Sequence, residues 1–157
     1  MAEAIIARLK NHLVMASDVD PQRLNLLRKK YKIKTSLNNS ECFSYGELVV
    51  LAVKPQQMAD VLKELGAGDR GPGTGKLVIS IAAGIPLSYL QKKLPGFPVI
   101  RAMPNNPCLV GEGVTALAKG KTVDRPQMKK AAAVFGAVGE VIEVPEKMMD
   151  AVTGLSG

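Results

Sequence analysis

Short apolar runs alternate along the chain with stretches in which apolar residues recur every three or four positions. The run at 48–53 is apolar at every position, and the runs at 77–81 and 99–102 are apolar at nearly every one. A strand with one face in water alternates between apolar and polar residues, so these runs predict strands covered on both faces, as in a parallel sheet. Shorter strand candidates lie at 13–16, 33–36, 114–118 and 140–144.

Helical patterns fill the segments between these strands. In residues 1–10 the apolar positions share one face of a helix. Asp20 and Pro21 are typical of an N-cap and a first helical position, so a helix is expected from there to Tyr31. Further helices are expected at 55–65, 86–94 and 125–137 and from 146 onward, and 38–45 is a loop or a short helix. This alternation of strands and helices predicts an α/β fold with a doubly wound, mainly parallel sheet.

The composition fits one globular domain. The chain has 157 residues, of which 46% are hydrophobic and 22% charged. It has no apolar run as long as a membrane-spanning helix, and its first residues lack the pattern of a signal peptide. Cys42 and Cys108 are too few for a disulfide framework or a zinc site, and any Ser-His-Asp or Cys-His arrangement would have to use the single His12. We expect reduced thiols, no bound metal and a cytoplasmic location.

The chain is basic, but its charge is dispersed. Lys and Arg number 21 against 14 Asp and Glu, a net charge of +7. Such a chain can bind nucleic acid, a membrane surface or an anionic small molecule. The densest basic cluster, 28–30 with Lys32, ends a predicted helix, and three Phe, three Tyr and no Trp give almost no platform for stacking bases. We therefore expect a small-molecule substrate, and neither nucleic acid nor a membrane as partner.

The glycine-rich segment 66–75 imitates two nucleotide-binding motifs. Residues 66–71 match G-x-G-x-x-G, but that motif needs a strand before it and a helix after it, so that helix N–H groups face a pyrophosphate. Here a helix is expected before it and a strand after it. Lys76 suggests a P-loop, yet Arg70 stands where that motif requires glycine and Leu77 where it requires Ser or Thr. We reject both interpretations.

Polar residues follow the ends of the predicted strands, where ligands bind in open α/β sheets. After the first strand, Asp18 suits a ribose 2′-hydroxyl, whereas Ser17 or Arg23 suits a 2′-phosphate. Turn and cap chemistry explains the same segment equally well. Lys54 follows the run at 48–53 and would place a cation beside an anionic or polyhydroxyl ligand, although exposed lysines in turns are common.

Two further strand ends have the same character. The residues at 82–84 are small, which lets a flat ring or a sugar approach the backbone, or else serves close packing of a helix on the sheet. The loop at 103–107 is rich in proline and asparagine and can present amides at fixed positions, or simply connect two elements. Each signal is weak alone. Because the carboxyl ends of parallel strands share one edge, together they predict a nucleotide site along that edge.

Five segments carry a likeness to a known family. They are LAVKP (51–55), VISIAAG (78–84), IRAMPNNP (100–107), LVGEGVTAL (109–117) and DAVTGLSG (150–157), in order along essentially the whole chain. Together they resemble the pyrroline-5-carboxylate reductase family. The resemblance implies a Rossmann-like fold and an oxidoreductase of proline biosynthesis. Such an enzyme reduces the C=N bond of 1-pyrroline-5-carboxylate to L-proline with hydride from NADPH (cofactor NADP), or from NADH as the alternative (cofactor NAD).

Both ends differ from the family pattern. Members of that family begin with a strand and G-x-G-x-M-A-x-A, and residues 1–4 match only the last part of it. The resemblance therefore implies a Rossmann-like sheet lacking its first strand, and a dinucleotide-binding domain at 1–145 that is incomplete at its N-terminus. It also implies that 146–157 starts the helix leading to a C-terminal dimerisation domain.

These differences set expectations for the isolated chain. We expect it to bind the cofactor weakly, to be inactive, and either to fold poorly or to leave an open sheet edge. A homo-oligomer is expected only for a full-length protein. The alternative function is that of a non-catalytic nucleotide-binding or interaction module derived from such a reductase.

The resemblance also assigns residues, position by position. The cofactor-binding residues would be Met1 and Ala2 at the first helix, Ser17 and Asn39 at the adenosine end, Ala52, Val53, Lys54, Pro55, Ile81, Ala82 and Ala83 along the ribose and nicotinamide, and Met103, Pro104 and Asn105 on the nicotinamide side. Glu146 would lie next to the substrate. As alternatives, Asn39 is a loop or cap residue, and Glu146 is an acid favoured by the dipole at a helix N-terminus. No catalytic residue and no metal ligand is assigned.

Overall fold

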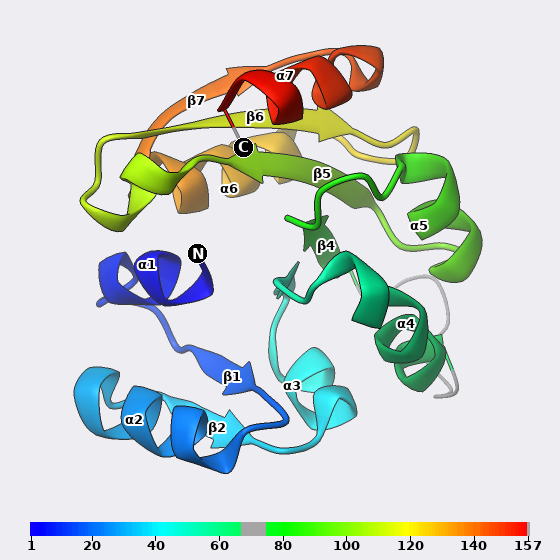
Figure 1. Ribbon diagram of the computed structural model, residues 1–157. Coiled ribbons are helices and arrows are strands. Elements are labelled where there is room, and N and C mark those ends of the chain that lie inside the picture. The colour runs from blue at the N-terminus through cyan, green and yellow to red at the C-terminus, as the bar shows by residue number, and fades with distance from the viewer. Residues whose placement is uncertain (67–74, 157) are drawn as a thin grey trace.

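Residues 1–66 and 75–156 are described by the computed structural model, which has strands layered between helices (Figure 1). The strands are β1 (Met15–Ser17), β2 (Lys34–Ser36), β3 (Leu48–Leu51), β4 (Leu77–Ser80), β5 (Val99–Pro104), β6 (Gly113–Lys119) and β7 (Gly139–Glu143). The helices are α1 (Ala2–Arg8), α2 (Pro21–Tyr31), α3 (Asn39–Tyr45), α4 (Met58–Gly66), α5 (Leu87–Lys93), α6 (Arg125–Gly136) and α7 (Met149–Ser156). Short 3₁₀ helices are η1 (Pro55–Gln57), η2 (Asn106–Leu109) and η3 (Glu146–Met148).

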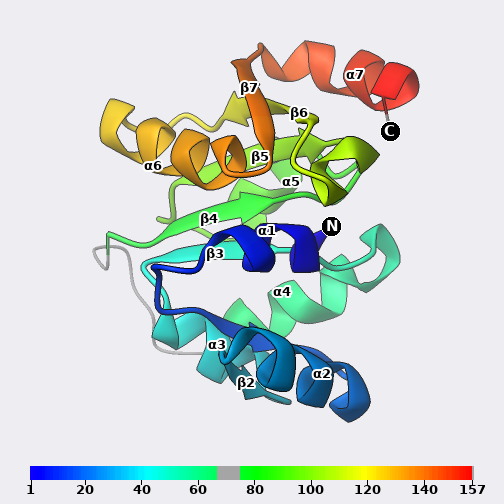
Figure 2. The ribbon, with the colours of Figure 1, turned by 90° about the vertical axis from the view of Figure 1, so that its left-hand side faces the viewer.

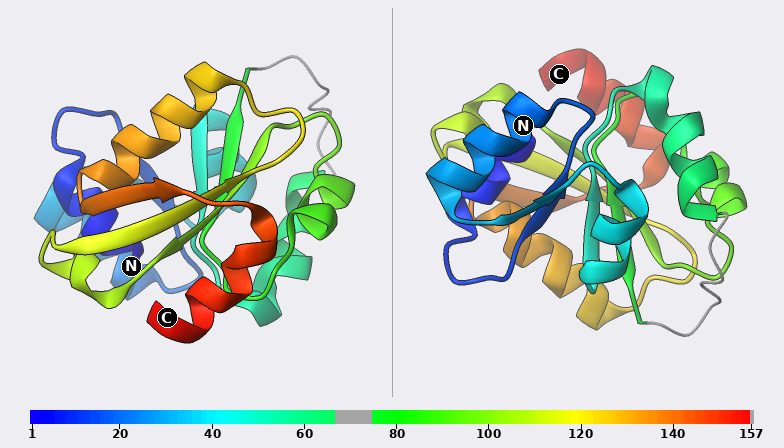
Figure 3. Two further views of the ribbon diagram at one scale, coloured as in Figure 1. Left: turned by 90° about the horizontal axis from the view of Figure 1, so that it is seen from above. Right: turned by 90° about the horizontal axis from the view of Figure 1, so that it is seen from below.

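Strands β3 to β7 form one sheet in the order β3-β4-β5-β6-β7, and β1 pairs with β2 in a second sheet. Every pairing is parallel except that of β5 with β6. Helices lie on both faces of the larger sheet, and Figure 3 shows α6 and α7 on opposite faces of β6 and β7. The predicted doubly wound, mainly parallel α/β fold is confirmed.

Side chains of β4 alternate between two core layers, one on each face of the sheet. Val78 packs in the layer that contains Leu90 of α5, and Ile79 in the layer that contains Ile5 of α1 and Phe135 of α6. All four residues of β4 are buried. The prediction of a strand covered on both faces is confirmed for β4.

Strand β3 departs from that prediction. Leu51 is buried, but Leu48, Val49 and Val50 are only half-buried. On one side β3 has β4, and on the other it has no strand among residues 1–66 and 75–156, because β1 pairs only with β2. The expected coverage of the 48–53 run on both faces is therefore only partly met: Leu48 and Val49 pack against the two core layers but stay half-buried, and Ala52 is exposed. The expected open edge exists at β3 and at β1. A strand with one neighbour leaves side chains and backbone groups open to solvent.

Capping residues begin α2 and α6, and the cap of α2 was predicted from the sequence. Asp20 accepts a hydrogen bond from the N–H of Gln22 at 2.8 Å, and Pro21 is the first residue of α2. Asp124 accepts the N–H of Gln127 at 2.7 Å in a reciprocal capping box at the start of α6. These contacts are local in sequence, so their residue types alone indicate them.

Two segments next to strands differ from, or add to, what the sequence predicted. The first strand begins later than expected, because Leu13 is 91% exposed and precedes β1. Lys76, from the rejected P-loop, is buried, and its amine donates to the carbonyl oxygens of Phe43, at 2.7 Å, and Gly46. It thus closes the C-terminus of α3. Of the rejected G-x-G-x-x-G segment, residues 67–71 lie outside the described part of the chain.

Helix α1 makes polar contacts with α2 and with the segment after η2, and it lies between α2 and the larger sheet in Figure 2. The carboxylate of Glu3 accepts hydrogen bonds from Arg23 at 2.6 Å, Lys30 at 3.0 Å and the Tyr31 hydroxyl at 2.8 Å, all on α2. The bonds from Lys30 and Tyr31 lower the pKa of Glu3 from 4.5 to about 2. At the other end of α1, Arg8 donates to the carbonyl of Val110, just after η2, at 3.0 Å.

Strands β6 and β7 begin at a glycine pair. Gly113 lies opposite Gly139 in register, and the N–H of Gly113 donates to the carbonyl of Val138 at 3.0 Å. A Cβ on Gly139 would overlap the backbone of Gly113, and Gly139 has a φ of +146°. A Cβ on Gly113 would overlap the sulfur of Cys108. Both positions therefore require glycine.

Candidate functional site

The ends of β3, β4 and β5 lie side by side at one edge of the larger sheet. Leu51 is paired with Ser80, and Ser80 with Arg101. Because these strands are parallel, the loops after them leave the sheet at the same edge, and Figure 2 shows β3 and β4 running towards its right-hand side. The loops contain residues 52–55, 81–84 and 103–105. The structure thus brings together three of the four strand ends singled out in the sequence.

These loops offer small and polar groups to solvent. Ala52 and Lys54 are exposed, and at Gly84, with a φ of +71°, nothing lies within 4 Å of the position of a Cβ. Ala82 and Pro104 are buried, so they support the loops from below instead of offering a contact surface. Of the remaining predicted residues here, Pro55 is exposed, and Val53, Ile81, Ala83, Met103 and Asn105 are half-buried. A flat ring or a sugar could lie against such a backbone.

Ser17 ends β1 and so belongs to the smaller sheet. It is half-buried, and it is the last residue of the strand, whereas the sequence placed it just after the strand. Beside it, Asp18 accepts the N–H of Asp20 at 3.0 Å, which is the turn chemistry considered as its alternative role. Arg23, the candidate partner of a 2′-phosphate, is engaged by Glu3 at 2.6 Å. The side chains of Asp18 and Arg23 are therefore both held by contacts within the protein.

Met1 and Ala2 stand at the start of α1. In Figure 2 this end of α1 lies on the side towards which β3 and β4 run. Met1 is half-buried and packs against the core layer that contains Ile79, whereas Ala2 is exposed. Only Ala2 therefore offers an open side chain at this position.

Asn39 is the first residue of α3 and lies by a hollow of about 380 Å³. Its amide Nδ2 donates to Oε2 of Glu64 on α4 at 2.7 Å. The capping role considered for Asn39 belongs to its neighbour Asn38, which accepts the N–H groups of Ser40 and Glu41. The hollow is lined by Leu37, Asn38, Asn39, Ser40 and Glu64.

Asn105 is fixed by its carbonyl end. Its Oδ1 accepts the N–H of Val114 on β6 at 2.9 Å and lies 3.9 Å from the sulfur of Cys108. This bond ties the loop after β5 to the start of β6. Among residues 1–66 and 75–156, no partner accepts a hydrogen bond from the opposite end of the side chain, the Nδ2 donor.

Glu146 begins η3 and contacts two other elements. Its Oε1 accepts the N–H of Leu87, at the start of α5, at 2.5 Å, and lies 3.8 Å from Nη1 of Arg101 on β5. Arg101 is 4% exposed and donates through Nη2 to Asp150 on α7 at 2.9 Å. Sequence reasoning missed Arg101 because it treated 99–102 as a buried apolar strand. The available signal was a cation inside that run.

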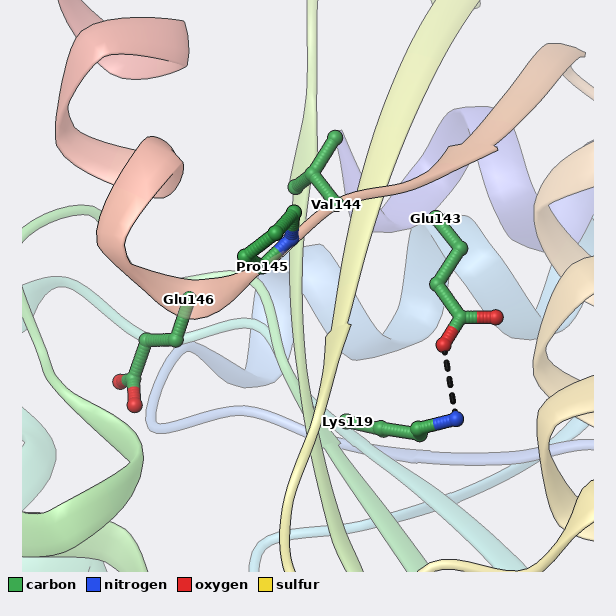
Figure 4. Close-up of a pocket in the computed structure, with 5 residues that line it drawn as sticks. All are labelled: Lys119, Glu143, Val144, Pro145 and Glu146. Atoms are coloured by element: carbon green, nitrogen blue, oxygen red, sulfur yellow. Dashed lines mark ion pairs between the residues drawn. The ribbon is translucent and has the colours of Figure 1, made fainter.

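Glu146 also borders a hollow of about 520 Å³, drawn in Figure 4. The hollow is lined by Lys119, Glu143, Val144, Pro145 and Glu146. Lys119 and Glu143 form an ion pair at 3.0 Å, and the carboxylate of Glu146 points away from that pair. Lys119 is paired in register with Ile100, near the start of β5, so this hollow lies away from the edge where the loops after β3 to β5 emerge.

Other chemistry is sparse in the described part of the chain. Cys42 and Cys108 are free thiols, and burial raises the pKa of Cys42. Within residues 1–66 and 75–156, no three side chains of His, Cys, Asp or Glu gather as they would around a metal ion. No helix in the same residues is both long and apolar enough to cross a membrane.

Known proteins match this chain in sequence. Residues 1–84 match the model of the family described as NADP oxidoreductase coenzyme F420-dependent. All of the chain aligns with the pyrroline-5-carboxylate reductase of Synechocystis at 46% identity, covering 60% of that protein. The reductase of Mycobacterium tuberculosis is 40% identical over 87% of this chain and 48% of its own length. The chain thus spans between about half and 60% of these curated relatives.

Solved structures agree with the sequence matches. The pyrroline-5-carboxylate reductase of Coxiella burnetii superposes with a TM-score of 0.90 at 31% identity, over 99% of this chain and 60% of that one. A Plasmodium falciparum pyrroline carboxylate reductase with NADP bound gives a TM-score of 0.82 at 27% identity, over 99% of this chain and 56% of that one. The resemblance drawn from the sequence motifs is confirmed. The chain belongs to the family of NADP oxidoreductases described as coenzyme F420-dependent, and pyrroline-5-carboxylate reductases are its relatives along its whole length.

Proposed function

We propose that this chain is the dinucleotide-binding part of a pyrroline-5-carboxylate reductase, an oxidoreductase of proline biosynthesis. The observation that carries the proposal is the 46% identity to such a reductase over the entire chain. It is supported by the three adjoining loops at the carboxyl ends of β3, β4 and β5, the position where open α/β sheets bind nucleotides. The substrate is then a small cyclic imine.

The residues at this edge suit a nicotinamide dinucleotide, NADPH or alternatively NADH. The small loop 81–84 leaves its backbone open, and Lys54 supplies an exposed cation for phosphate or hydroxyl groups. Asn105 offers its amide donor on the nicotinamide side. Ser17 and Asn39 would contact the adenosine end, and Met1 and Ala2 the part between.

When bound, the cofactor supplies the hydride that reduces the C=N carbon of 1-pyrroline-5-carboxylate. The chain's own residues bind and orient, and the loops after β4 and β5 would exclude water from the ring. No nucleophile is needed, which suits a site without a histidine or cysteine constellation. Glu146 is the candidate contact to the substrate, since a carboxylate favours the protonated imine, the better hydride acceptor.

The wider assignments follow from the same proposal. The curated relatives are longer than this chain, and we infer a division into a dinucleotide-binding domain at 1–145 and, from 146, the start of the segment that leads to a dimerisation domain. A homo-oligomer belongs to the longer protein. Two free thiols suit a reducing compartment such as the cytoplasm. The alternative is a nucleotide-binding module without catalysis.

NMR titration of the chain with NADPH, and in parallel with NADH, tests the cofactor site. We expect the amide signals of 52–55, 81–84 and 103–105 to move together, and Lys54→Met to weaken binding several-fold through loss of one phosphate-directed charge. Lys119→Met, which removes another exposed lysine away from this edge, should change nothing. Shifts confined to other segments, or none at millimolar cofactor, would refute the site.

A turnover assay separates the two candidate functions. NADPH oxidation that depends on added 1-pyrroline-5-carboxylate supports the reductase. Cofactor binding without such turnover, in a chain extended to the length of its relatives as well as in this one, supports the non-catalytic module.

A further inference from the structure

Arg101 is a buried charge to which the proposed function gives no role. It lies in β5 between Ile100 and Ala102, which are 0% and 1% exposed, and its own side chain is 5% exposed. Taking a guanidinium out of water is costly, and well-packed apolar residues often replace buried ion pairs without loss of stability. A charge at this position therefore needs an explanation beyond packing.

The contacts of Arg101 all lead to the segment after β7. Its Nη2 donates to Asp150 of α7 at 2.9 Å, and its Nη1 lies 3.8 Å from Oε1 of Glu146 in η3. The same oxygen accepts the N–H of Leu87 at 2.5 Å. One guanidinium thus joins β5 to η3 and α7, and Glu146 extends the connection to the start of α5. A planar fork of donors fixes direction as well as distance.

This connection adjoins the candidate site. Side chains two apart in a strand share a face, so Met103 lies on the same face of β5 as Arg101. Met103 packs against the core layer that also receives Val152 of α7. Helix α7 therefore packs on this face of β5 and contacts it at Arg101, two residues before the 103–105 loop. Within the described residues, Oε2 of Glu146 makes no hydrogen bond, whereas Oε1 is held from two sides.

We propose that Arg101 is a positioning residue. It fixes η3 and α7 against β5, and it helps to hold Glu146 by one carboxylate oxygen so that the other is left for the substrate. The second half of this inference rests on the proposed function, whereas the first half concerns the chain alone.

Amide hydrogen exchange on the chain tests the inference, with the Leu87 N–H as the reporter of Glu146. In Arg101→Met, which keeps the length and removes the charge, we expect the Leu87 amide and the α7 amides to exchange about tenfold faster, since hydrogen bonds to charged groups are the stronger ones. Arg101→Lys should restore part of the protection. Lys119→Met, which breaks the exposed ion pair with Glu143 in the neighbouring hollow, should leave the Leu87 amide unchanged.

Unchanged protection of Leu87 and α7 in Arg101→Met would overturn the inference, and so would equal acceleration at the Ile79 amide, which would mean general loss of stability. Should Arg101→Met fail to fold, Asp150→Asn decides the first half, because Asp150 is 84% exposed and we expect its substitution to leave the fold intact. It should speed exchange in α7 and spare Ile79. NADPH binding is measured on the same samples: a wild-type chain that binds none refutes the proposed function, while the exchange data still decide the role of Arg101.

Discussion

The middle of the larger sheet and the region of β1, β2 and α1 are built from similar parallel pairings but are held in different ways. In β4 every side chain is buried, both edges are paired, and a core layer covers each face. In β1 all three residues are half-buried and one edge is unpaired. The contacts of α1 with α2 include the charged groups around Glu3. Parallel pairing alone therefore does not make a core; neighbours on both edges and both faces do.

Matched valines give the largest test of this contrast. Val78 in β4 and Val49 in β3 are opposite each other in register, and Val78 is 0% exposed while Val49 is half-buried. We expect Val78→Ala to lower the free energy of unfolding by about 2–3 kcal/mol and Val49→Ala by about 1 kcal/mol, because the second site already meets solvent. Denaturant unfolding measures both, and equal losses would mean that β3 is as well covered as β4.

Helix α3 joins the two regions, and loss of the contacts at its end should lower stability by an intermediate amount. Lys76 closes α3, which connects β2 to β3, by donating to two backbone carbonyls. Lys76→Met leaves those carbonyls without their charged donor, and we expect a loss of about 1–3 kcal/mol in the free energy of unfolding. Lys119→Met serves as the control, since its ion pair is about half exposed and contributes little. A loss no greater than the control's would show that water replaces the amine.

The polar contacts of Glu3 between α1 and α2 give the smallest expected loss of stability, and this loss depends on pH. The folded chain lowers the pKa of Glu3 from 4.5 to about 2, so its contribution to stability is complete above pH 4.5 and is lost as the pH falls towards 2. Glu3→Gln should cost about 1 kcal/mol at neutral pH and flatten the acid limb of the stability curve. Thermal unfolding between pH 2 and neutral pH measures this, with the exposed Glu140→Gln as the control. The same dependence of stability on pH in both variants as in the wild type would contradict the prediction.

The sequence was most informative where structure is local. Asp20 and Asp124 cap the helices that their residue types indicate, because a cap involves neighbours only two or three positions away. The 48–53 and 77–81 runs are similarly apolar, yet only the second is fully covered in its strand, since coverage depends on which strand lies alongside. That choice belongs to topology, and single apolar runs do not encode it.

The candidate site follows the same division. The loops at 52–55, 81–84 and 103–105 could be placed at one edge from strand direction alone. The role of Arg101 could not be foreseen, because its hydrogen-bond partner Asp150 lies 49 residues further along the chain. Nor could the orientation of Asn105, which is set by the N–H of Val114 on another strand.

The glycine pair at the start of β6 and β7 sets how the outermost strand can move. A slide of β7 by one residue would place the Cβ of Val138 or Glu140 where only Gly139 fits against Gly113. Steric contact between the two backbones thus fixes the register of β7 against β6. All five residues of β7 are nevertheless exposed or half-buried, so its register depends on backbone contacts more than on buried side chains.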